Sequence, residues 1–451
     1  MNKSLWIALV CGVLLFVSCK SNAPSQRVIA ENTILIYGTS GGRMDYLFEN
    51  FLQMLQNQII DRTQCRFIVC YKYGQNVPGR AFSGTFANPG DLIIFELTNQ
   101  TDFHNLDKRQ VLLNVGTEFE FFDDENLSVL LEVVTELVPA KTYHMLLWGH
   151  GGGYDLTAEW DGADEASPSP GPRRAMLYDE WIQGANGDNR SLTVYEFKRA
   201  LENSPIPHFG SICFHNCLMG NIEILNEICD KADYILASAH VLNSNGTIAA
   251  EYCTQLMEKG SVDAMKDELF AQIQEDIQHR YHGVNGDFQL LKPDAIPEVV
   301  SVVTRLRERV MTLYPTMQPA IDQATAHTYQ FDKKDVFYDL ADYARQLAQE
   351  TNDSALQAIS HDLQEAMDKV IVKQASVHNA ATGDLDRFSL SVVLVDKNTY
   401  TEPRDWHYTF RQTYEYSAFH QSTGWGLWLG TNEQTLPTSS TPFGYPATQG
   451  N

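Results

Sequence analysis

Positive charge is scarce in this sequence. The 451 residues include 33 Lys and Arg against 57 Asp and Glu, which gives a formal net charge of −24 at pH 7. A protein that binds nucleic acid needs a basic face to neutralise phosphates, so the composition excludes that class of protein. The acidity indicates solubility and repulsion from anionic surfaces rather than a particular substrate.

Long apolar runs are also lacking. One apolar stretch, residues 5–17, is shorter than the ~18 to 20 residues of a membrane-spanning helix and is typical of a secretory signal. It ends in Ser18-Cys19, which resembles a bacterial lipobox. We expect a signal peptide over residues 1–18, a lipid on Cys19 and a tether over 19–30, and therefore a protein anchored in the bacterial cell envelope on its periplasmic or surface face. An ordinary signal peptide with a chance cysteine is the alternative.

The cysteines do not follow a disulfide pattern. Six of them lie beyond the signal segment and Cys19: Cys65, Cys70, Cys213, Cys217, Cys229 and Cys253. A protein of this size needs no disulfides for stability, and irregular spacing is not that of a disulfide scaffold. We therefore expect at least one thiol to be available for chemistry.

Apolar runs of strand length alternate with segments of helical periodicity in the first part of the chain. The strand-like runs begin at residues 32, 65, 91, 142, 207 and 233. This alternation predicts an α/β fold with a mostly parallel sheet sandwiched by helices. We assign residues 31–258 to a first domain of this α/β type, with an exposed loop at 159–176. Residues 259–451 follow as a helix-rich C-terminal extension with a late strand near 388–400.

Three helix starts are predicted from local signals. One helix begins near Asn126 or Ser128, and a second is capped by Ser191. A third covers residues 218–232, directly after Cys217. The positive end of such a helix would lower the pKa of the Cys217 thiol.

Two of the expected strands end in reactive side chains. His150 follows "HMLLWG" and Cys217 follows "SICFHN". Catalytic groups gather at the carboxyl ends of the strands in open α/β sheets, so neighbouring strands would bring the two together. An imidazole can take the proton of a thiol and create a nucleophile. Backbone N–H groups of Gly151 and Cys217 are candidates for an oxyanion hole.

The two motifs "LLWGHGGGY" (146–154) and "FHNCLMGNIEIL" (214–225) resemble the clostripain-like (C11) cysteine peptidases of the caspase, gingipain and legumain clan. Further likeness, in the same order along the chain, covers most of the sequence after the tether. The resemblance implies a caspase-like fold and an enzyme that needs no cofactor. It also implies that His150 is the general base, that Cys217 is the nucleophile forming an acyl-enzyme, and that Gly151 and Cys217 bind the oxyanion.

One position departs from the family pattern. The family commonly has Asp two residues before the nucleophile, where its carboxylate helps to bind a basic P1 side chain, and this chain has His215 there. An imidazole cannot pair with Arg or Lys as a carboxylate does. His240, Asn243 and Asn245 are further candidates for the substrate pocket, and none is acidic. We predict a P1 preference that is not basic.

Maturation and calcium are two further features of such peptidases. The family is often cleaved between the histidine and cysteine segments, where Arg173-Arg174 lie in the 159–176 loop. If the enzyme does not accept basic residues, another protease would have to cut there. Calcium remains an alternative for the acidic stretches 122–126 and 161–165, although no EF-hand spacing is present.

Other interpretations of the same residues remain open. Cys213, His215, Cys217 and His150 are acceptable zinc ligands, but C-x-H-x-C on a buried strand gives poor tetrahedral geometry, and we assign no metal site. Tryptophans 406, 425 and 428 are either a sugar-binding platform or packing residues. The partner we expect is a peptide or protein substrate. The alternative function is a catalytically silent surface lipoprotein that binds peptides or glycans on the same fold.

Overall fold

The computed structural model describes residues 29–39, 43–72, 91–102, 106, 111–116, 119–154, 176–183, 189–242, 246–281, 284–331, 337–378, 385, 387–394, 414 and 417–426. Cys19, Arg173, Arg174, Asn243 and Asn245 therefore lie outside the described residues, as do the 161–165 stretch and tryptophans 406 and 428.

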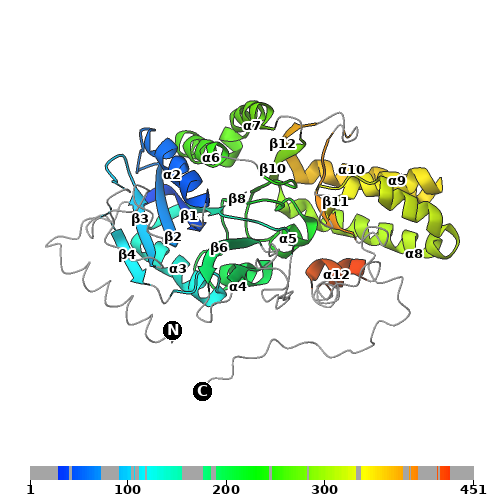
Figure 1. Ribbon diagram of the computed structural model, residues 1–451, viewed down its shortest axis with the longest axis horizontal. Helices are drawn as coiled ribbons and strands as arrows, with labels where there is room; N and C mark the ends of the chain where they lie inside the picture. Colours follow the sequence, from blue (N-terminus) through cyan, green and yellow to red (C-terminus); the bar gives the residue numbers. More distant parts are fainter. Residues whose placement is uncertain are drawn as a thin grey trace, which may run out of the picture.

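One large sheet forms the centre of the described structure (Figure 1). It has nine strands in the order β12-β10-β9-β8-β5-β1-β2-β3-β4 within the described residues. Their bounds are β1 Ala30–Thr39, β2 Cys65–Lys72, β3 Leu92–Leu97, β4 Val111–Gly116, β5 Ala140–Trp148, β8 Ser211–His215, β9 Ile235–Ala237, β10 Gly286–Leu291 and β12 Ile371–Val377.

The middle of the sheet is parallel and its two edges are antiparallel. β9, β8, β5, β1 and β2 run parallel to one another. β3 and β4 extend one edge in antiparallel pairing, and β10 and β12 extend the other. The prediction of a mostly parallel α/β sheet is confirmed.

Strands β1, β5 and β8 of the parallel core each carry a continuous buried apolar run, residues 34–37, 145–148 and 212–214, because helices cover both faces. Along β1, Ile34 and Ile36 face one layer of the core, and Leu35 and Tyr37 face the other. Alternate residues of a strand point to opposite faces, so where both faces are covered, consecutive positions are apolar. This explains why the sequence signal is a continuous run rather than an alternation.

Helices form a layer on each face of the sheet (Figure 1). The core on one face includes residues of α2 (Arg43–Gln56), α6 (Thr247–Lys259) and α7 (Val262–Arg280). The core on the other face includes α3 (Asp124–Leu137), α4 (Val194–Glu202) and α5 (Ile222–Glu227). A short hairpin of β6 (Leu177–Gln183) and β7 (Asn189–Leu192) precedes α4.

The first two predicted helix starts are each misplaced by a few residues. α3 is capped by Asp123, whose Oδ1 accepts the N–H of Asn126 over 2.9 Å, so neither Asn126 nor Ser128 is the cap. α4 is capped by Thr193 in a reciprocal capping box with Glu196, while Ser191 belongs to β7. A cap is decided by which side chain can reach the free N–H groups, and several neighbouring polar residues compete for that place.

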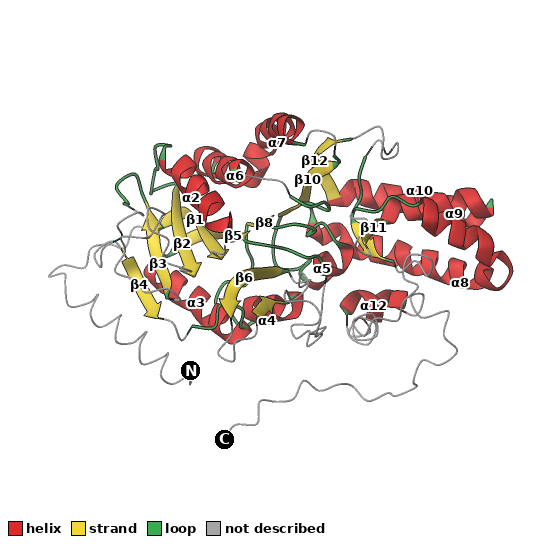
Figure 2. Cartoon of the chain, in the orientation of Figure 1, coloured by secondary structure: helices red, strands yellow, loops and turns green. Residues whose placement is uncertain are grey.

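The C-terminal part forms a helical lobe beside the sheet (Figure 2). α8, α9 and α10 pack against one another, and α12 lies against α8 and α5. The elements are η1 Pro293–Ala295, α8 Ile296–His327, β11 Phe337–Asp339, α9 Leu340–Thr351, α10 Ser354–Val370, β13 Ser391–Val393 and α12 Ala418–Thr423. β11 and β13 pair with each other as a separate small sheet.

The division expected at residue 258 falls in the last turn of α6. Residues on both sides of it share the nine-stranded sheet, because β10 and β12 come from the C-terminal part. Within the described residues, no helix is long and apolar enough to cross a membrane.

Candidate active site

Two neighbouring strands carry His150 and Cys217 to the same edge of the sheet. β5 and β8 are parallel, and their register places Trp148 opposite His215. His150 follows Trp148 by two residues, and Cys217 follows His215 by two. Both side chains are partly exposed, whereas the strands before them are buried. The expected meeting of the two motifs at the carboxyl ends is therefore observed.

The two segments touch through their backbones. The Asn216 Nδ2 donates to the carbonyl oxygen of His150 over 3.3 Å. A Cβ atom placed on Gly151 would lie 2.5 Å from the carbonyl oxygen of Cys217 and 3.0 Å from its nitrogen. Real Cβ atoms do not approach backbone that closely, so only glycine allows this contact.

The chain after Cys217 is not a helix at first, and the predicted helix over 218–232 is wrong in its start. Leu218 has a left-handed backbone with φ of 63°. Its N–H donates to the carbonyl oxygen of His240 over 3.0 Å, and that of Gly220 donates to Ser238 over 2.8 Å. These bonds to another segment hold the backbone out of helical geometry. α5 begins only at Ile222, so no helix start lies at Cys217.

The sulphur of Cys217 accepts a hydrogen bond from another segment, which no local pattern in the sequence indicates. The backbone N–H of Leu242 donates to Cys217 Sγ over 3.3 Å. Leu242 lies in the loop after β9, the strand next to β8 in the sheet. A donor placed on a sulphur favours its thiolate form, so this N–H takes the role that we had assigned to a helix dipole.

The other cysteines of the described chain differ from Cys217 in burial. Cys65, Cys70, Cys213 and Cys253 are fully buried, and Cys229 is half-buried. Burial raises the pKa of the Cys213 thiol far above its ordinary value. The four residues of the zinc interpretation do not gather their ligand atoms: in the described chain the one group with metal-like spacing is His361, Asp362 and Glu365, in helix α10.

His215 points into the core layer beneath the α2 and α6 face. Its ring stacks on Trp148 with centroids 4.2 Å apart and planes 4° apart, and Trp148 stacks in turn on Phe51. Burial lowers the pKa of His215 to about 3, because the charged imidazolium would lose its hydration. At neutral pH this position therefore holds a flat, uncharged ring.

His240 lies in a buried hydrogen-bonded cluster. Its Nδ1 is 2.8 Å from Asp287 Oδ1, and its Nε2 is 2.9 Å from the hydroxyl oxygen of Tyr329. Both ring nitrogens are thus occupied by protein partners, and only 3% of the residue is exposed. The next residue is different: Val241 is 49% exposed and offers apolar surface one residue from the Leu242 donor.

Residues of the C-terminal part form hydrogen bonds with the segment that follows Cys217. The N–H of Ser391 donates to Gly220 over 2.8 Å, and Glu223 accepts from the N–H of Val393 and the hydroxyl of Tyr414. Burial raises the pKa of Glu223 to about 7. Sequence reasoning recognised the strand around 391 but missed this role, since nothing local links it to Gly220.

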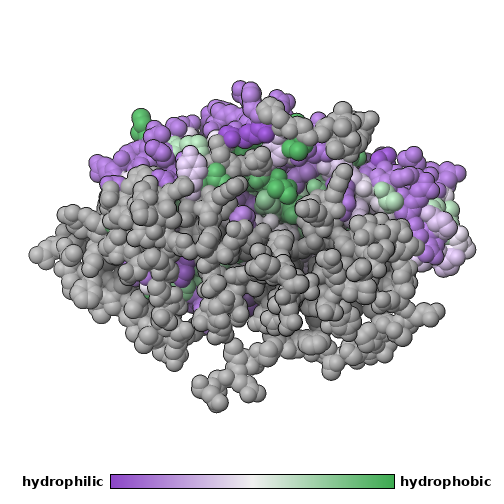
Figure 3. Space-filling view, viewed as in Figure 1, coloured by the Kyte–Doolittle hydropathy of each residue, from purple (hydrophilic) through white to green (hydrophobic). Residues whose placement is uncertain are grey.

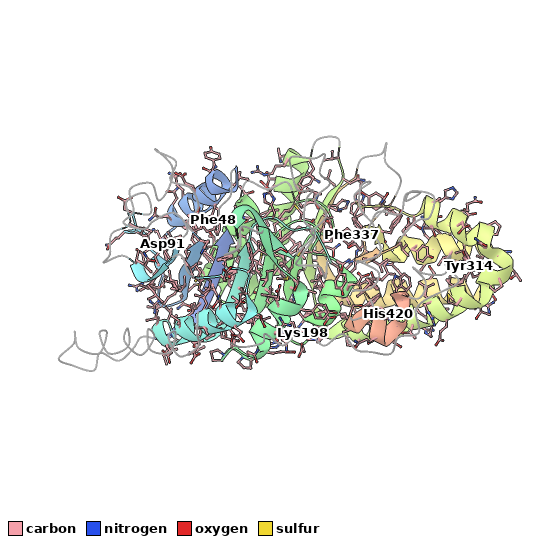
Figure 4. All side chains as sticks on the ribbon, turned by 60° about the horizontal axis from the view of Figure 1, so that its bottom comes forward. Phe48, Asp91, Lys198, Tyr314, Phe337 and His420 are labelled. Carbon is pink, nitrogen blue, oxygen red and sulfur yellow. The ribbon has the colours of Figure 1, made fainter. Side chains whose placement is uncertain are left out.

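The segment after His150 has a C-terminal neighbour as well. Gly153 has φ of 80°, and a side chain there would overlap the ring of Phe337. Phe337, labelled in Figure 4, lies where the sheet meets the helical lobe. Both catalytic segments therefore depend on residues far along the chain.

The remaining candidate residues that are described have structural roles. Asp123 caps α3, and Asp124 Oδ2 pairs with Arg199 Nε over 2.7 Å, so two carboxyl groups of the 122–126 stretch are engaged by protein groups. Trp425 is buried and its indole N–H donates to the carbonyl oxygen of Val393 over 2.9 Å. For Trp425 the packing interpretation is confirmed.

Comparison with known proteins agrees with this geometry. A family model described as Peptidase_C11, Clostripain family, matches residues 92–429, which is more than half of the chain. A search of curated proteins found no match.

Three solved structures share the architecture. A secreted C11 cysteine protease from Bacteroides thetaiotaomicron, "iotapain", is 15% identical with a TM-score of 0.62, over 88% of this chain and 100% of that one. A secreted C11 protease of the same organism, in complex with an irreversible peptide inhibitor, is 14% identical with a TM-score of 0.59, over 88% and 99%. An inactive zymogen C11 protease from Parabacteroides distasonis is 15% identical with a TM-score of 0.56, over 88% and 98%. At such identities these likenesses establish the fold.

Proposed function

Since the chain belongs to the Clostripain family of C11 cysteine peptidases, we propose that it is an endopeptidase that works through Cys217 and His150. The observation that carries the proposal is the contact of the two strand-end segments, with Gly151 against the backbone of Cys217. A partly exposed thiol and a partly exposed imidazole, each two residues beyond the paired ends of neighbouring strands, supply the two groups that nucleophilic catalysis needs. The peptide inhibitor held by one relative supports a peptide as the substrate.

The proposed reaction has two steps. His150 takes the proton of the Cys217 thiol, and the sulphur attacks the carbonyl carbon of the scissile bond. The tetrahedral intermediate collapses to a thioester while His150 gives the proton to the leaving amine. Water, deprotonated by the same imidazole, then attacks the thioester and releases the acid. The N–H groups of Gly151 and Cys217 would bind the negative oxygen in both steps.

The substrate pocket is proposed to favour a P1 side chain without positive charge. His215 replaces the expected carboxyl group with a neutral, buried ring stacked on Trp148. Val241 adds exposed apolar surface beside the Leu242 donor, and apolar surface also gathers near the middle of the face drawn in Figure 3. Asn243 and Asn245 stay candidates for the same pocket. A cation placed there would lose its hydration without gaining a partner.

A peptide library with a varied P1 residue tests this specificity. We expect efficient cleavage after apolar or neutral residues, and cleavage after Arg or Lys that is much slower but still measurable. Val241→Asp should raise the relative kcat/KM for a P1 Lys about two- to fivefold, the value of an exposed ion pair. Ile59→Asp is the matched control. Ile59 is 89% exposed and precedes β2, at the opposite end of the sheet from Cys217. The substitution adds the same charge, and we expect it to leave the P1 preference unchanged. Efficient cleavage of trypsin-type peptides by the wild type would refute the prediction.

We also propose a lipid anchor at Cys19 and cleavage in the 159–176 loop by another protease. The lipobox-like Ser18-Cys19 supports the first, and Arg173-Arg174 in a Gly- and Pro-rich stretch support the second. Mass spectrometry of protein from the membrane fraction tests both.

The expected spectrum contains an N-terminal peptide that begins at lipid-modified Cys19 and two chains separated within the loop. The Cys217→Ala variant should be cut in the same way, because its own activity is not needed. A single intact chain in fully active enzyme would remove the loop proposal. An unmodified Cys19 in a protein that stays soluble would remove the anchor.

A further inference from the structure

A buried carboxyl group lies behind the nucleophile and is not used by the proposed reaction. Asp287, on β10, is fully buried. Four donors converge on its Oδ1: the Ser238 hydroxyl at 3.0 Å, the N–H groups of Ala239 at 3.1 Å and His240 at 3.2 Å, and the His240 ring at 2.8 Å. Its Oδ2 accepts from the Gln289 side chain over 2.7 Å. So many donors on one acid fix the backbone of the segment that supplies them.

That segment is the one that holds the nucleophile in place. The carbonyl oxygens of Ser238 and His240 accept the N–H groups of Gly220 and Leu218, on the chain directly after Cys217. Two residues beyond His240, the N–H of Leu242 reaches the Cys217 sulphur. The loop that Asp287 fixes is therefore joined to the nucleophile segment at three points.

We propose that Asp287 is a positioning residue for catalysis, which fixes the 238–242 segment so that the Leu242 N–H donates to the Cys217 sulphur. The inference rests on the proposed function, because it concerns the same nucleophile. Asp287 does not touch the reacting atoms. It acts through the backbone of the segment, and His240 contributes by joining the carboxyl group to Tyr329.

The surroundings of His240 explain why the arrangement is rigid. Its ring meets Phe331 and Phe388 edge-on, with centroids 4.7 and 4.5 Å apart, and Asn285 donates to the hydroxyl of Tyr329 over 2.8 Å. A buried polar cluster of this kind has one satisfied geometry, since every displaced donor would lose a partner out of water. The titratable side chains that bond to the 238–242 segment include Asp287 and Tyr329, on the His240 ring, and Tyr281, whose hydroxyl donates to the carbonyl oxygen of Val241 over 3.3 Å.

Alkylation of Cys217 by iodoacetamide at a series of pH values tests the inference without any peptide substrate. Mass spectrometry of the peptide that contains Cys217 separates its reaction from that of the buried thiols. Asp287→Ala should shift the midpoint of the profile upward by about one pH unit, and Asp287→Asn by a smaller amount, because the donor to the thiolate is no longer held. Peptide kcat/KM should fall about ten- to a hundredfold.

The matched control is His144→Ala. His144 is also a buried imidazole, with Ser211 Oγ at 2.7 Å and Asn32 Oδ1 at 3.1 Å, but it lies six residues before His150, within β5 rather than at its carboxyl end. This variant should lose stability and keep the alkylation profile. If Asp287→Ala does not fold, the Asp287→Asn variant decides the matter by the same profile.

Failure of the inference about Asp287 and failure of the proposed peptidase function give different results. A folded Asp287 variant with the wild-type alkylation profile would overturn the inference, even if peptides are cleaved. A wild-type Cys217 that reacts as an ordinary thiol would overturn it too. A lowered midpoint that depends on Asp287, in a protein that cleaves no peptide, would support the inference and reject the proposed function.

Discussion

Replacing Cys217 by alanine is expected to abolish peptide cleavage, by a factor on the order of 10⁴ or more. The reason is that no other group at the site can form the thioester, because the thiols nearby in the core are buried. Cys217 itself is only partly buried, and its sulphur accepts one hydrogen bond from Leu242. The free energy of unfolding should change little. Turnover of the peptide library and thermal unfolding, measured on the same preparation, give the two quantities.

Cys213→Ala is the matched control for this variant. Cys213 lies on β8, four residues before Cys217, and is fully buried. Its replacement should cost about 1 kcal/mol of stability through the small cavity, with activity retained. Residual cleavage by Cys217→Ala would exclude this nucleophile. If the wild type stays silent even after limited proteolysis of the 159–176 loop, while it still binds peptides or glycans, the catalytically silent lipoprotein becomes the better interpretation.

The parts of the fold that could be predicted are those decided by burial. β1, β5 and β8 each contain a buried apolar run, residues 34–37, 145–148 and 212–214, because both faces of the sheet are covered, and such runs are visible without any knowledge of partners. Their alternation with helical segments predicted a parallel core and predicted that His150 and Cys217 lie at the same edge of the sheet. The family resemblance added their roles.

The parts that failed are decided by hydrogen bonds between distant residues. Residues 218–232 have the composition of a helix, yet the N–H groups of Leu218 and Gly220 bond to the segment after β9 instead. Leucine rarely adopts a left-handed backbone conformation, so the conformation of Leu218 could not be predicted from its residue type. As a result, the Cys217 sulphur accepts a hydrogen bond from the backbone N–H of Leu242, and no helix begins at Cys217.

Contacts between residues that are distant along the chain could not be predicted either. The sequence predicts His240 as a pocket residue because it follows the strand next to the one that leads to Cys217, and the structure holds its ring in a buried hydrogen-bonded cluster. What its ring contacts depends on Asp287 and Tyr329, which come from other elements. A single sequence holds no signal for such pairs.

Gly151→Ala should lower kcat/KM about a hundredfold, and it tests whether the two catalytic segments need their present contact. The new Cβ would meet the carbonyl oxygen of Cys217 at 2.5 Å and the Asn216 Cβ at 2.8 Å. Because the nearest of these atoms is backbone, the segments must move apart. A displacement of about 1 Å between nucleophile, base and oxyanion donors is enough for a loss of this size. The overlap should also cost about 1 to 3 kcal/mol of stability.

Gly260→Ala separates this effect from the general cost of replacing a glycine. Gly260 ends α6 with φ of 78°, and nothing lies within 4 Å of a Cβ there. Its substitution should destabilise the protein by about 1 kcal/mol through backbone strain alone and leave kcat/KM unchanged. If the two variants lose similar stability but only Gly151→Ala loses activity, the activity loss comes from a changed geometry of the site. Full activity of Gly151→Ala would mean that the segments tolerate separation, and the oxyanion role assigned to the Gly151 N–H would then have to be abandoned.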